Sequence, residues 1–274
     1  MTVWINGTLL PDSEARISVF DHGLVVGDGV FETIKVIGGV PFAVTRHLAR
    51  LAQSAAGLGL PEPDLEEIAA GTLALLEASG RPATGKIRLT LTAGAGPLGS
   101  QRGDSALTAI IALGSLGGPG PTCDVVMAPW PRNEYGALTG LKTTSYAENV
   151  LALQYASARD ADEAIFANTA GHLCEGTGSN IFVVSGGRLL TPPLSAGCLA
   201  GVTRDLLIEW ADAVEADLAA GALAAADEAF LTGTTRDVQP IRNVDSVPLA
   251  AAPGPVTANA AKIFAARSAE NPDP

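Results

Sequence analysis

The sequence predicts an α/β protein of two domains, and three observations indicate this architecture. The chain has 274 residues, which is more than one small core needs and suits two α/β lobes or one large lobe. Strand-like and helix-like patterns alternate along it. Residues 113–121 (LGSLGGPGP) have neither periodicity nor side-chain bulk, as in a linker. We therefore expect a small α/β domain at 1–113, a linker at 114–121 and a larger α/β domain at 122–274.

The first domain contains two helix patterns between strand patterns. A helix is predicted over 43–57, because Leu48 and Leu51 lie at helical spacing. A second helix is predicted over 64–79, with Asp64 as its N-cap. Strands are expected where β-branched and apolar residues cluster between glycine turns. These strands are 3–9, 28–37, 86–93 and 106–113.

The second domain shows closely spaced strand patterns and two further helices. One helix is predicted over 202–215 from the spacing of Leu206 and Trp210, and a terminal helix is predicted near 256–268. The residues after it, 269–274 (AENPDP), have the composition of a frayed tail. The strands expected here are 163–168, 173–175, 179–184, 188–191 and 228–232.

Composition and charge argue against several classes of protein. A chain that is 47% hydrophobic, with 31 glycines and 18 prolines, is globular and rich in turns. A net charge of −12 spread along the chain argues against a nucleic-acid or anionic-membrane partner. Cys123, Cys174 and Cys198 have no metal-ligand spacing, so no metal is expected. Because we find no signal peptide and no apolar run of roughly 18 residues, we expect a cytoplasmic location without a membrane partner.

Lys142 is one of four lysines and the strongest candidate for a reactive amine. Ser145 and Glu148 form an S-x-x-E capping pattern, which predicts that a helix begins one turn after the lysine. The partial positive charge at a helix N-terminus disfavours the ammonium form of a nearby amine. A neutral amine is what an imine-forming lysine needs. A solvated surface lysine is the alternative interpretation for any lysine taken alone.

Glu175 and three anion-binding features supply the other polar groups. Glu175 lies between apolar strands beside a glycine bend. Its carboxylate either faces water or lies near a heteroaromatic nitrogen that it would keep protonated. The three anion-binding features are Arg50 in the first helix, the turn Gly201-Val202-Thr203 before a helix and the turn Gly233-Thr234-Thr235 after an apolar strand. Taken alone, such a turn is more often a plain helix cap, and such an arginine is more often a solvated charge.

One motif points elsewhere but is weak. Gly94-Ala-Gly-Pro-Leu-Gly99 matches the G-x-G-x-x-G pattern of nicotinamide-dependent enzymes. Pro97 interrupts the motif, and the residues after it have no helical period. We therefore expect a loop at 94–102 and no dinucleotide site.

Taken in order along the chain, these residues resemble the class IV (fold type IV) pyridoxal-phosphate enzymes. The family includes branched-chain aminotransferases, D-amino-acid aminotransferases, (R)-selective amine transaminases and aminodeoxychorismate lyases. The resemblance runs nearly from end to end of the chain. It is carried by 21–23 (DHG) with 27–32 (GDGVFE), His47 with Arg50 and Leu51, Leu141 with Lys142, 175–182 (EGTGSNIF), 199–204 (LAGVTR) and 233–235 (GTT).

The resemblance implies a pyridoxal 5′-phosphate cofactor and a role for each matched residue. Lys142 would form a Schiff base with the cofactor (the internal aldimine) and move a proton between the substrate and the cofactor. Glu175 would face the pyridine nitrogen, and Leu199 would pack on the ring. The phosphate would be held by Arg50, Val202, Thr203 and Thr234.

The resemblance also implies a fold and partners. The family fold is a small α/β domain plus a larger α/β domain of pseudo-barrel form, with the cofactor at their junction. A homodimer usually completes the site. The expected partners are therefore a small-molecule amino donor, a 2-oxo acid acceptor and a second copy of the chain.

The residues that the resemblance places at the substrate are Phe31, Leu98, Arg102 and Thr235. Phe31 stands where D-amino-acid enzymes commonly have tyrosine. Leu98 stands where those enzymes have a carboxylate-binding arginine, and a loop shift would let Arg102 replace it. A site without this arginine would either accept amines that lack a carboxylate or recruit Arg102. Some branched-chain enzymes place a tyrosine five residues after the lysine, whereas Tyr146 lies four residues after it, so that role is not carried over.

Three functions stay open at this point. The first is an aminotransferase that exchanges an amino group between an amino acid, with a D-amino acid or an (R)-amine expected, and a 2-oxo acid such as pyruvate or 2-oxoglutarate. The second is aminodeoxychorismate lyase, which uses the same Schiff base but eliminates pyruvate and yields 4-aminobenzoate. The third is a cofactor-binding scaffold, which is disfavoured because no catalytic group is missing.

Overall fold

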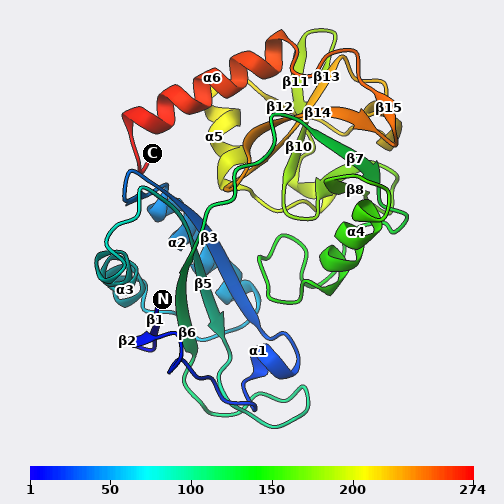
Figure 1. Ribbon diagram of the computed structural model, residues 1–274. Helices are drawn as coiled ribbons and strands as arrows, with labels where there is room; N and C mark the ends of the chain where they lie inside the picture. Colours follow the sequence, from blue (N-terminus) through cyan, green and yellow to red (C-terminus); the bar gives the residue numbers. More distant parts are fainter. The chain divides into compact units, whose positions relative to one another are not determined.

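The computed structural model describes residues 1–274, which form two compact units (Figure 1). Unit 1 comprises Met1–Gly117, Leu141–Tyr146 and Pro272–Pro274, and unit 2 comprises Gly118–Gly140 and Ala147–Asn271. The break after residue 117 lies within the predicted linker. The predicted larger domain, 122–274, is wrong for two short segments, Leu141–Tyr146 and Pro272–Pro274. Both belong to unit 1, because their hydrogen bonds are made with residues of that unit.

Unit 1 is built on a six-stranded antiparallel sheet. The strands are β1 (Thr2–Ile5), β2 (Thr8–Pro11), β3 (Gly29–Ile37), β4 (Val40–Pro41), β5 (Thr84–Thr92) and β6 (Thr108–Gly114). Their order across the sheet is β2-β1-β6-β5-β3-β4.

One face of this sheet forms the core of unit 1. Ile34 on β3 and Leu89 on β5 lie on this face, since alternate residues of a strand share a face. The same cluster includes Leu51 of α2 (Val44–Gly57) and Leu75 of α3 (Leu65–Ala78), so both of these helices cover this face (Figure 1). The helices of unit 1 are α1 (His22–Val25), α2 (Val44–Gly57) and α3 (Leu65–Ala78).

The predicted strand at 3–9 is two strands, because the chain reverses at Asn6 and Gly7. Both residues have positive φ, 45° and 86° respectively. Asn-Gly with two positive φ values is the preferred two-residue connection of a β-hairpin. The turn therefore divides the predicted strand into β1 and β2.

The C-terminal tail caps helix α2. The N-cap residue of this helix, Ala43, has a left-handed conformation (φ 54°) and no side-chain cap. Asp273 instead accepts hydrogen bonds from the backbone N–H of Thr45 (2.9 Å) and from its hydroxyl (2.6 Å). A carboxylate is stabilised at a helix N-terminus by the free N–H groups and their partial positive charge. The prediction of a frayed tail over 269–274 is therefore wrong.

Unit 2 is built on a nine-stranded mixed sheet. The strands are β7 (Cys123–Met127), β8 (Glu163–Ala167), β9 (Leu173–Gly176), β10 (Asn180–Ser185), β11 (Arg188–Thr191), β12 (Val214–Glu215), β13 (Glu228–Gly233), β14 (Asp237–Val244) and β15 (Val247–Pro248). Their order is β12-β11-β10-β13-β14-β7-β8-β9, and β15 pairs with β14. The pairs β11–β12, β14–β7 and β7–β8 are parallel, and the others are antiparallel.

Unit 2 also contains three α-helices and two short 3-10 helices. The helix predicted over 202–215 ends at Trp210, because Asp212 adopts a left-handed conformation (φ 53°) that a helix cannot continue. Strand β14 was not predicted, since Pro240 and Arg242 break its apolar pattern. The helices are α4 (Ala147–Ser157), α5 (Val202–Trp210), α6 (Pro255–Glu270), η1 (Leu194–Ala196) and η2 (Ala220–Ala222).

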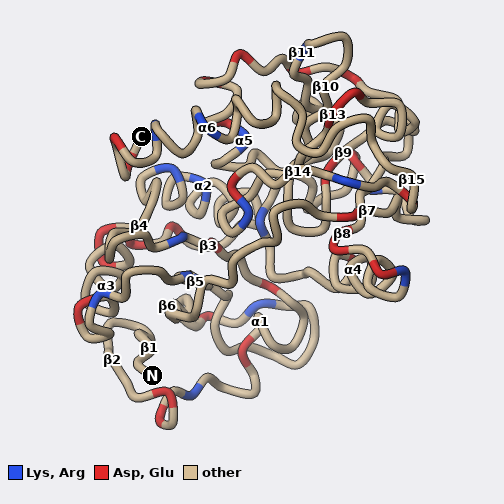
Figure 2. Tube along the Cα trace, turned by 45° about the horizontal axis from the view of Figure 1, so that its top comes forward, with Lys and Arg blue, Asp and Glu red and all other residues tan.

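Acidic and basic residues are interspersed along the trace of each unit, so the charge of −12 is not gathered in one block (Figure 2). None of the helices has both the length and the apolar character that crossing a membrane requires. All three cysteines are buried and free.

Candidate active site

The backbone around Lys142 is pinned to the edge of β3. The N–H of Phe31 donates to the Lys142 carbonyl at 2.9 Å, and the N–H of Thr144 donates to the Gly29 carbonyl at 2.8 Å. On its other side, the Lys142 N–H donates to the hydroxyl of Ser54 in α2 at 3.1 Å. Three hydrogen bonds therefore fix the backbone of the lysine segment.

The Lys142 amine lies between aromatic rings of unit 1. Its Nζ atom is 4.4 Å from the centroid of the Phe31 ring and 3.5 Å from the hydroxyl of Tyr146, a long hydrogen bond. The Phe31 and Tyr146 rings meet edge to face, with centroids 5.1 Å apart. The side chain of Lys142 is half-buried. The amine is therefore partly enclosed by the Phe31 and Tyr146 side chains and is not a fully solvated lysine.

Helix α4 begins at Ala147, close to the predicted start, but the predicted capping side chains have other partners. The Ser145 hydroxyl donates to the Gly27 carbonyl at 3.0 Å. The Glu148 carboxylate pairs with Arg132. Ser145 thus fastens the lysine segment to the loop before β3.

Arg50, the predicted phosphate ligand of α2, binds a buried carboxylate. Its Nε donates to Oε1 of Glu32 and its Nη2 donates to Oε2, both at 2.7 Å. The Nδ1 atom of His47 lies 2.7 Å from the same Oε2. Glu32 comes from β3, where it is fully buried on the core face between Val30 and Ile34. Two nitrogens of the guanidinium are thus bound by Glu32, which fixes the direction of the Arg50 side chain.

The protonation states of this cluster follow from its surroundings. Burial opposes ionisation of Glu32, but the charge and hydrogen bonds of Arg50 outweigh it and lower the pKa of Glu32 to about 2. Burial lowers the pKa of His47, and the charges of Arg50 and Lys142 add to this effect against the opposing carboxylate. At neutral pH Glu32 is ionised, and His47 is neutral and donates its Nδ1–H to the carboxylate.

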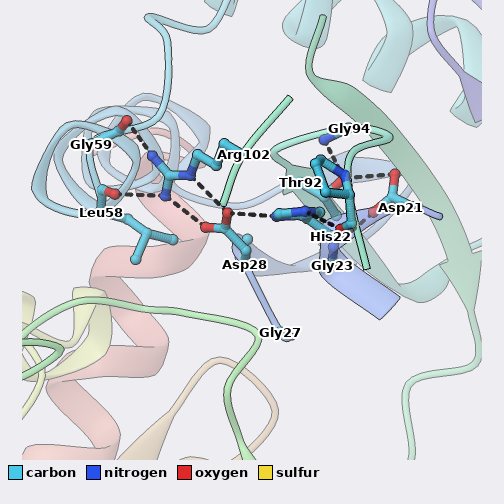
Figure 3. A network of polar contacts seen from close by, with 12 residues as sticks. Asp21, His22, Gly23, Gly27, Asp28, Leu58, Gly59, Thr92, Gly94 and Arg102 are labelled. Atoms are coloured by element: carbon cyan, nitrogen blue, oxygen red, sulfur yellow. Dashed lines mark hydrogen bonds and ion pairs between the residues drawn. The ribbon is translucent and has the colours of Figure 1, made fainter. Parts of the chain in front are cut away.

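A second polar network holds the loop that follows β5 (Figure 3). Asp21 accepts hydrogen bonds from the hydroxyls of Thr92 (2.9 Å) and Thr108 (2.7 Å), which close the base of the loop. The Nε2 atom of His22 lies 2.9 Å from the Pro97 carbonyl. The G-x-G-x-x-G segment lies in this loop and contains no helix, as the sequence predicted.

Arg102 is part of the same network and binds the fold itself. Its Nε and Nη2 donate to the carboxylate of Asp28 at 2.7 and 2.6 Å. Its Nη1 donates to the Gly59 carbonyl (2.5 Å) and its Nη2 to the Leu58 carbonyl (2.9 Å), just beyond α2 (Figure 3). These four hydrogen bonds hold Arg102 on the fold, so its role as a substrate-binding arginine stays a prediction that would require the loop to shift. Leu98 is 71% exposed at the tip of the loop.

In unit 2, Glu175 on β9 is tied to Leu199. The Leu199 N–H donates to Oε2 of Glu175 at 2.9 Å, and Nε of Arg132 lies 3.5 Å from Oε1. The guanidinium of Arg132 in turn lies over the Phe166 ring, 4.1 Å from its centroid. The Asn180 side chain donates to the Leu199 carbonyl at 2.8 Å. The two residues expected at the cofactor ring are thus held by one hydrogen-bonded network.

The glycine bend after Glu175 is organised by a buried acid, Glu163. Its Oε1 accepts hydrogen bonds from the backbone N–H and the hydroxyl of Thr177. Its Oε2 accepts from the Ser179 hydroxyl at 3.2 Å and from Arg236 at 3.1 Å. Glu163 thus binds Thr177 and Ser179 of the glycine bend and also Arg236, which follows Thr235. It therefore links the glycine bend to the turn at 233–235.

The predicted anion turns of unit 2 have different surroundings. Helix α5 begins after Gly201 without a side-chain cap, so the N–H groups of its first turn are left to other acceptors. A Cβ atom on Gly201 would lie 1.9 Å from Oδ1 of Asn180, so only glycine fits there. Thr203 is buried in the first turn of α5, and Thr234 and Thr235 are half-buried in the β13–β14 connection.

The sequence missed several residues that shape these arrangements. Glu32 had a signal, because Val30, Glu32 and Ile34 alternate and place an acid among core residues. No sequence pattern indicated Arg88 or Arg132, since each contacts an aromatic ring that is distant in the sequence. Lys142 and Arg50 lie in unit 1, whereas Glu175, Leu199, Val202, Thr203, Thr234 and Thr235 lie in unit 2.

The sequence comparisons agree on one family. The family model of amino-transferase class IV matches residues 29–244. A protein of Methanocaldococcus jannaschii, provisionally named a branched-chain-amino-acid aminotransferase, is 35% identical over 89% of this chain and 88% of its own length. The D-alanine aminotransferase of Bacillus licheniformis is 30% identical over 94% of each chain. Another relative is named aminodeoxychorismate lyase. A further relative is named bifunctional aminodeoxychorismate lyase / D-amino acid transaminase.

The solved structures place the chain in the same family. The branched-chain aminotransferase from Thermoproteus uzoniensis, solved with norvaline, has a TM-score of 0.90 and 30% identity, over 97% of this chain and 93% of that chain. A hypothetical aminotransferase from Mycobacterium tuberculosis in its PLP-bound form has a TM-score of 0.87 and 27% identity, over 97% and 98% of the two chains. The chain therefore belongs to the class IV aminotransferases, a family of fold type IV enzymes that depend on pyridoxal 5′-phosphate.

Proposed function

We propose that this enzyme exchanges an amino group between an amino acid, or an amine, and a 2-oxo acid, with Lys142 as the lysine that binds the cofactor. The donor class that we propose is a D-amino acid or an (R)-amine, and L-branched-chain amino acids are the competing class. The observation that carries the proposal is the setting of the Lys142 amine. Its backbone is fixed by β3 and α2, and its Nζ lies 4.4 Å from the Phe31 ring.

The side chains present fit pyridoxal 5′-phosphate. Unit 1 offers the Lys142 amine for the aldehyde carbon and the buried Arg50 cation for a phosphate oxygen. Unit 2 offers the Glu175 carboxylate for the protonated pyridine nitrogen and the apolar Leu199 for the ring. We propose that the phosphate is held by Arg50, Val202, Thr203 and Thr234. When bound, the cofactor withdraws electrons from the substrate carbon that bears the amino group.

The residues around the amine have proposed tasks of their own. The Nζ atom of Lys142 would remove the proton from the substrate Cα, because a positioned amine of suitable basicity is a general base. Phe31 would shield that atom from water, since its ring is 4% exposed and lies beside the amine. Thr235 would contact the substrate from the turn after β13.

A homodimer is also proposed, as the resemblance implies. The segment around α1 supports it, because it exposes several large apolar side chains that a monomer would leave in water. These are Ile17, Val19, Phe20, Leu24 and Val26, which are between 44% and 69% exposed. Sedimentation equilibrium should give twice the mass of the chain, whereas the mass of one chain would contradict this part of the proposal. A cytoplasmic location stays a prediction from the sequence.

The test of the proposed function is the half-reaction of the holoenzyme. The purified protein is mixed with D-alanine, L-leucine, D-glutamate, L-glutamate or (R)-1-phenylethylamine. An aminotransferase converts the visible absorbance of the Schiff base to the near-ultraviolet absorbance of the pyridoxamine form. The donor with the fastest conversion identifies the donor class. Conversion with L-amino acids only would overturn the proposed donor class but not the transaminase activity.

Aminodeoxychorismate lyase is the second candidate, favoured by the relatives that carry this name. A lyase would release pyruvate and 4-aminobenzoate from aminodeoxychorismate without consuming a 2-oxo acid. If this release occurs and no donor in the panel gives the half-reaction, the transaminase proposal is wrong.

A further inference from the structure

Arg132 is a partly buried arginine of unit 2 to which none of the proposals above gives a task. Its backbone is fixed beside β8, because its N–H donates to the Ala167 carbonyl at 2.7 Å and it forms a parallel bridge with Asn168. Its side chain is 14% exposed, so most of it is removed from water. A buried cation needs partners, and those of Arg132 lie around the proposed cofactor contacts of unit 2.

An aromatic ring directs the Arg132 side chain. The guanidinium lies 4.1 Å from the centroid of the Phe166 ring, which is fully buried. Phe166 on β8 is directly opposite Glu175 on β9 in an antiparallel pair, and opposite side chains of such a pair lie on the same face. Because stacking on a fixed ring orients the planar group, Phe166 holds Arg132 beside the Glu175 carboxylate.

The Nε atom of Arg132 lies 3.5 Å from Oε1 of Glu175, an ion-pair distance. This nitrogen is buried and has no hydrogen-bond partner. A cation next to a carboxylate favours the ionised form of that carboxylate. Because an arginine keeps its charge at all physiological pH values, Glu175 always faces a positive charge on this side.

The other nitrogens of the guanidinium bind the first turn of α4. Nη1 donates to the Glu148 carboxylate, and Nη1 and Nη2 both lie 3.4 Å from Oδ1 of Asn149. Asn149 in turn donates to the Thr177 carbonyl in the glycine bend after Glu175. Arg132 therefore connects Glu175 to the helix that follows the lysine segment, and Glu148 competes with Glu175 for its charge.

We propose that Arg132 is a positioning residue for Glu175, whose carboxylate it holds in place and in the ionised form. The proposal rests on the proposed function, in which Glu175 faces the pyridine nitrogen of the cofactor. One proton lies between that nitrogen and the carboxylate. A guanidinium beside a carboxylate makes the carboxylate less basic, so the proton stays on the ring, which then withdraws electrons more strongly.

The test compares Arg132→Gln and Arg132→Lys with the matched control Arg159→Gln. Arg159 also belongs to unit 2 and also lies against a ring, 3.5 Å from the centroid of Tyr155, but it is exposed and donates to the Tyr155 carbonyl. Its removal changes the net charge equally without touching Glu175. Two quantities are measured: the dissociation constant of pyridoxal phosphate for the dialysed protein, and the midpoint pH at which the visible absorbance of the bound cofactor changes.

Arg132→Gln should raise the midpoint by about one pH unit, because a ring that withdraws electrons less leaves the Schiff-base nitrogen more basic. It should also raise the dissociation constant roughly 10-fold, because Glu175 is no longer held. Arg132→Lys should restore most of the midpoint but less of the affinity, since lysine keeps the charge and loses the planar contact. An unchanged midpoint in Arg132→Gln, or an equal shift in Arg159→Gln, would overturn the proposal.

Glu148→Gln gives a test with the opposite sign. Loss of the competing carboxylate leaves more of the Arg132 charge to Glu175, so the midpoint should fall by roughly 0.3 pH units. Glu148 is 48% exposed, so this variant should fold even if Arg132→Gln does not. A midpoint that stays the same or rises would show that these contacts serve packing alone and would contradict the proposed role.

A double-variant cycle locates the effect at Glu175. In a Glu175→Gln protein, Arg132→Gln should shift the midpoint no further, because Arg132 acts through that carboxylate. A further shift as large as that in the wild-type background would sink the proposal. Neither the titration nor the midpoint requires turnover. If no donor gives the half-reaction, the proposed transaminase function is wrong, but these measurements still decide the role of Arg132.

Discussion

The backbone N–H of Phe31 donates a 2.9 Å hydrogen bond to the carbonyl of Lys142, and this bond joins the backbone of Lys142 to β3. Phe31 and its neighbour Glu32 point to opposite faces of the sheet. The amine therefore lies on one face, while the carboxylate that orients Arg50 lies on the other. One strand thus positions two of the groups proposed to bind the cofactor.

Glu32→Gln should destabilise the protein by about 3 kcal/mol, because it removes the buried carboxylate that binds two nitrogens of Arg50 and Nδ1 of His47. The free energy of unfolding is measured by urea denaturation. Glu62→Gln is the control, since Glu62 is exposed and its loss should cost less than about 0.5 kcal/mol. A Glu32→Gln protein as stable as the control would show that the buried pair is not a stabilising element.

The stability should fall as the pH falls, in two stages. The pKa of His47 in the folded protein is below its usual 6.5, so its contribution is complete above pH 6.5 and is lost as the pH falls through its folded pKa. The pKa of Glu32 is lowered from 4.5 to about 2, so its contribution is complete above pH 4.5 and is lost toward pH 2. The second stage is worth on the order of 3 kcal/mol.

Urea denaturation at a series of pH values measures this profile. Glu32→Gln should make it less steep below pH 4.5, because the variant lacks the Glu32 carboxylate. Asp28 and Asp124, whose pKa values are also lowered, keep the remaining slope. A profile with the same slope in wild type and variant would contradict the assignment of the acid stage to Glu32.

Gly201→Ala should weaken cofactor binding. The added methyl group would lie 1.9 Å from Oδ1 of Asn180, so the Asn180 side chain must move and lose its bond to the Leu199 carbonyl. We expect a loss of about 2 kcal/mol in stability and about a 10-fold loss of pyridoxal-phosphate affinity. The stability is measured by denaturation, and the affinity is measured by titration of the dialysed protein with the cofactor. Gly221→Ala is the control, since no atom lies within 4 Å of its added Cβ, and an equal loss there would refute the explanation.

Arg102→Gln should loosen the loop between β5 and β6. The variant loses the pair with Asp28 and the bonds to the carbonyls of Leu58 and Gly59. Amide hydrogens of residues 95–106 should exchange roughly 10-fold faster by mass spectrometry. Arg16→Gln, at an exposed position, should leave this exchange unchanged. Unchanged exchange in Arg102→Gln would mean that other contacts hold the loop.

Much of the local structure could be predicted from the sequence, because it depends on local patterns. Asp64 accepts a hydrogen bond from the Glu67 N–H at 2.9 Å and starts α3 as the sequence indicated. The long strands β3 and β5 also lie within a residue or two of their predicted bounds, since alternation of core residues defines them. The order of motifs around Lys142 identified the family, which the comparisons confirm.

The features that the sequence did not predict depend on contacts distant in the chain. Nothing local indicates that Asp273 caps α2, or that the lysine segment pairs with β3 and joins unit 1. The ion pair between Arg102 and Asp28 could likewise not be predicted, because these residues are far apart in the sequence and only the fold brings them together. The same holds for Arg88, whose neighbour Phe31 lies on another strand.

The central claim is that Lys142, among the four lysines of the chain, forms the Schiff base with pyridoxal phosphate. Reduction of the holoenzyme with borohydride makes this bond permanent, and peptide mass spectrometry then locates it. The account predicts a phosphopyridoxyl group on Lys142 and on no other lysine. A label on Lys35, Lys86 or Lys262, with Lys142 unmodified, would contradict it.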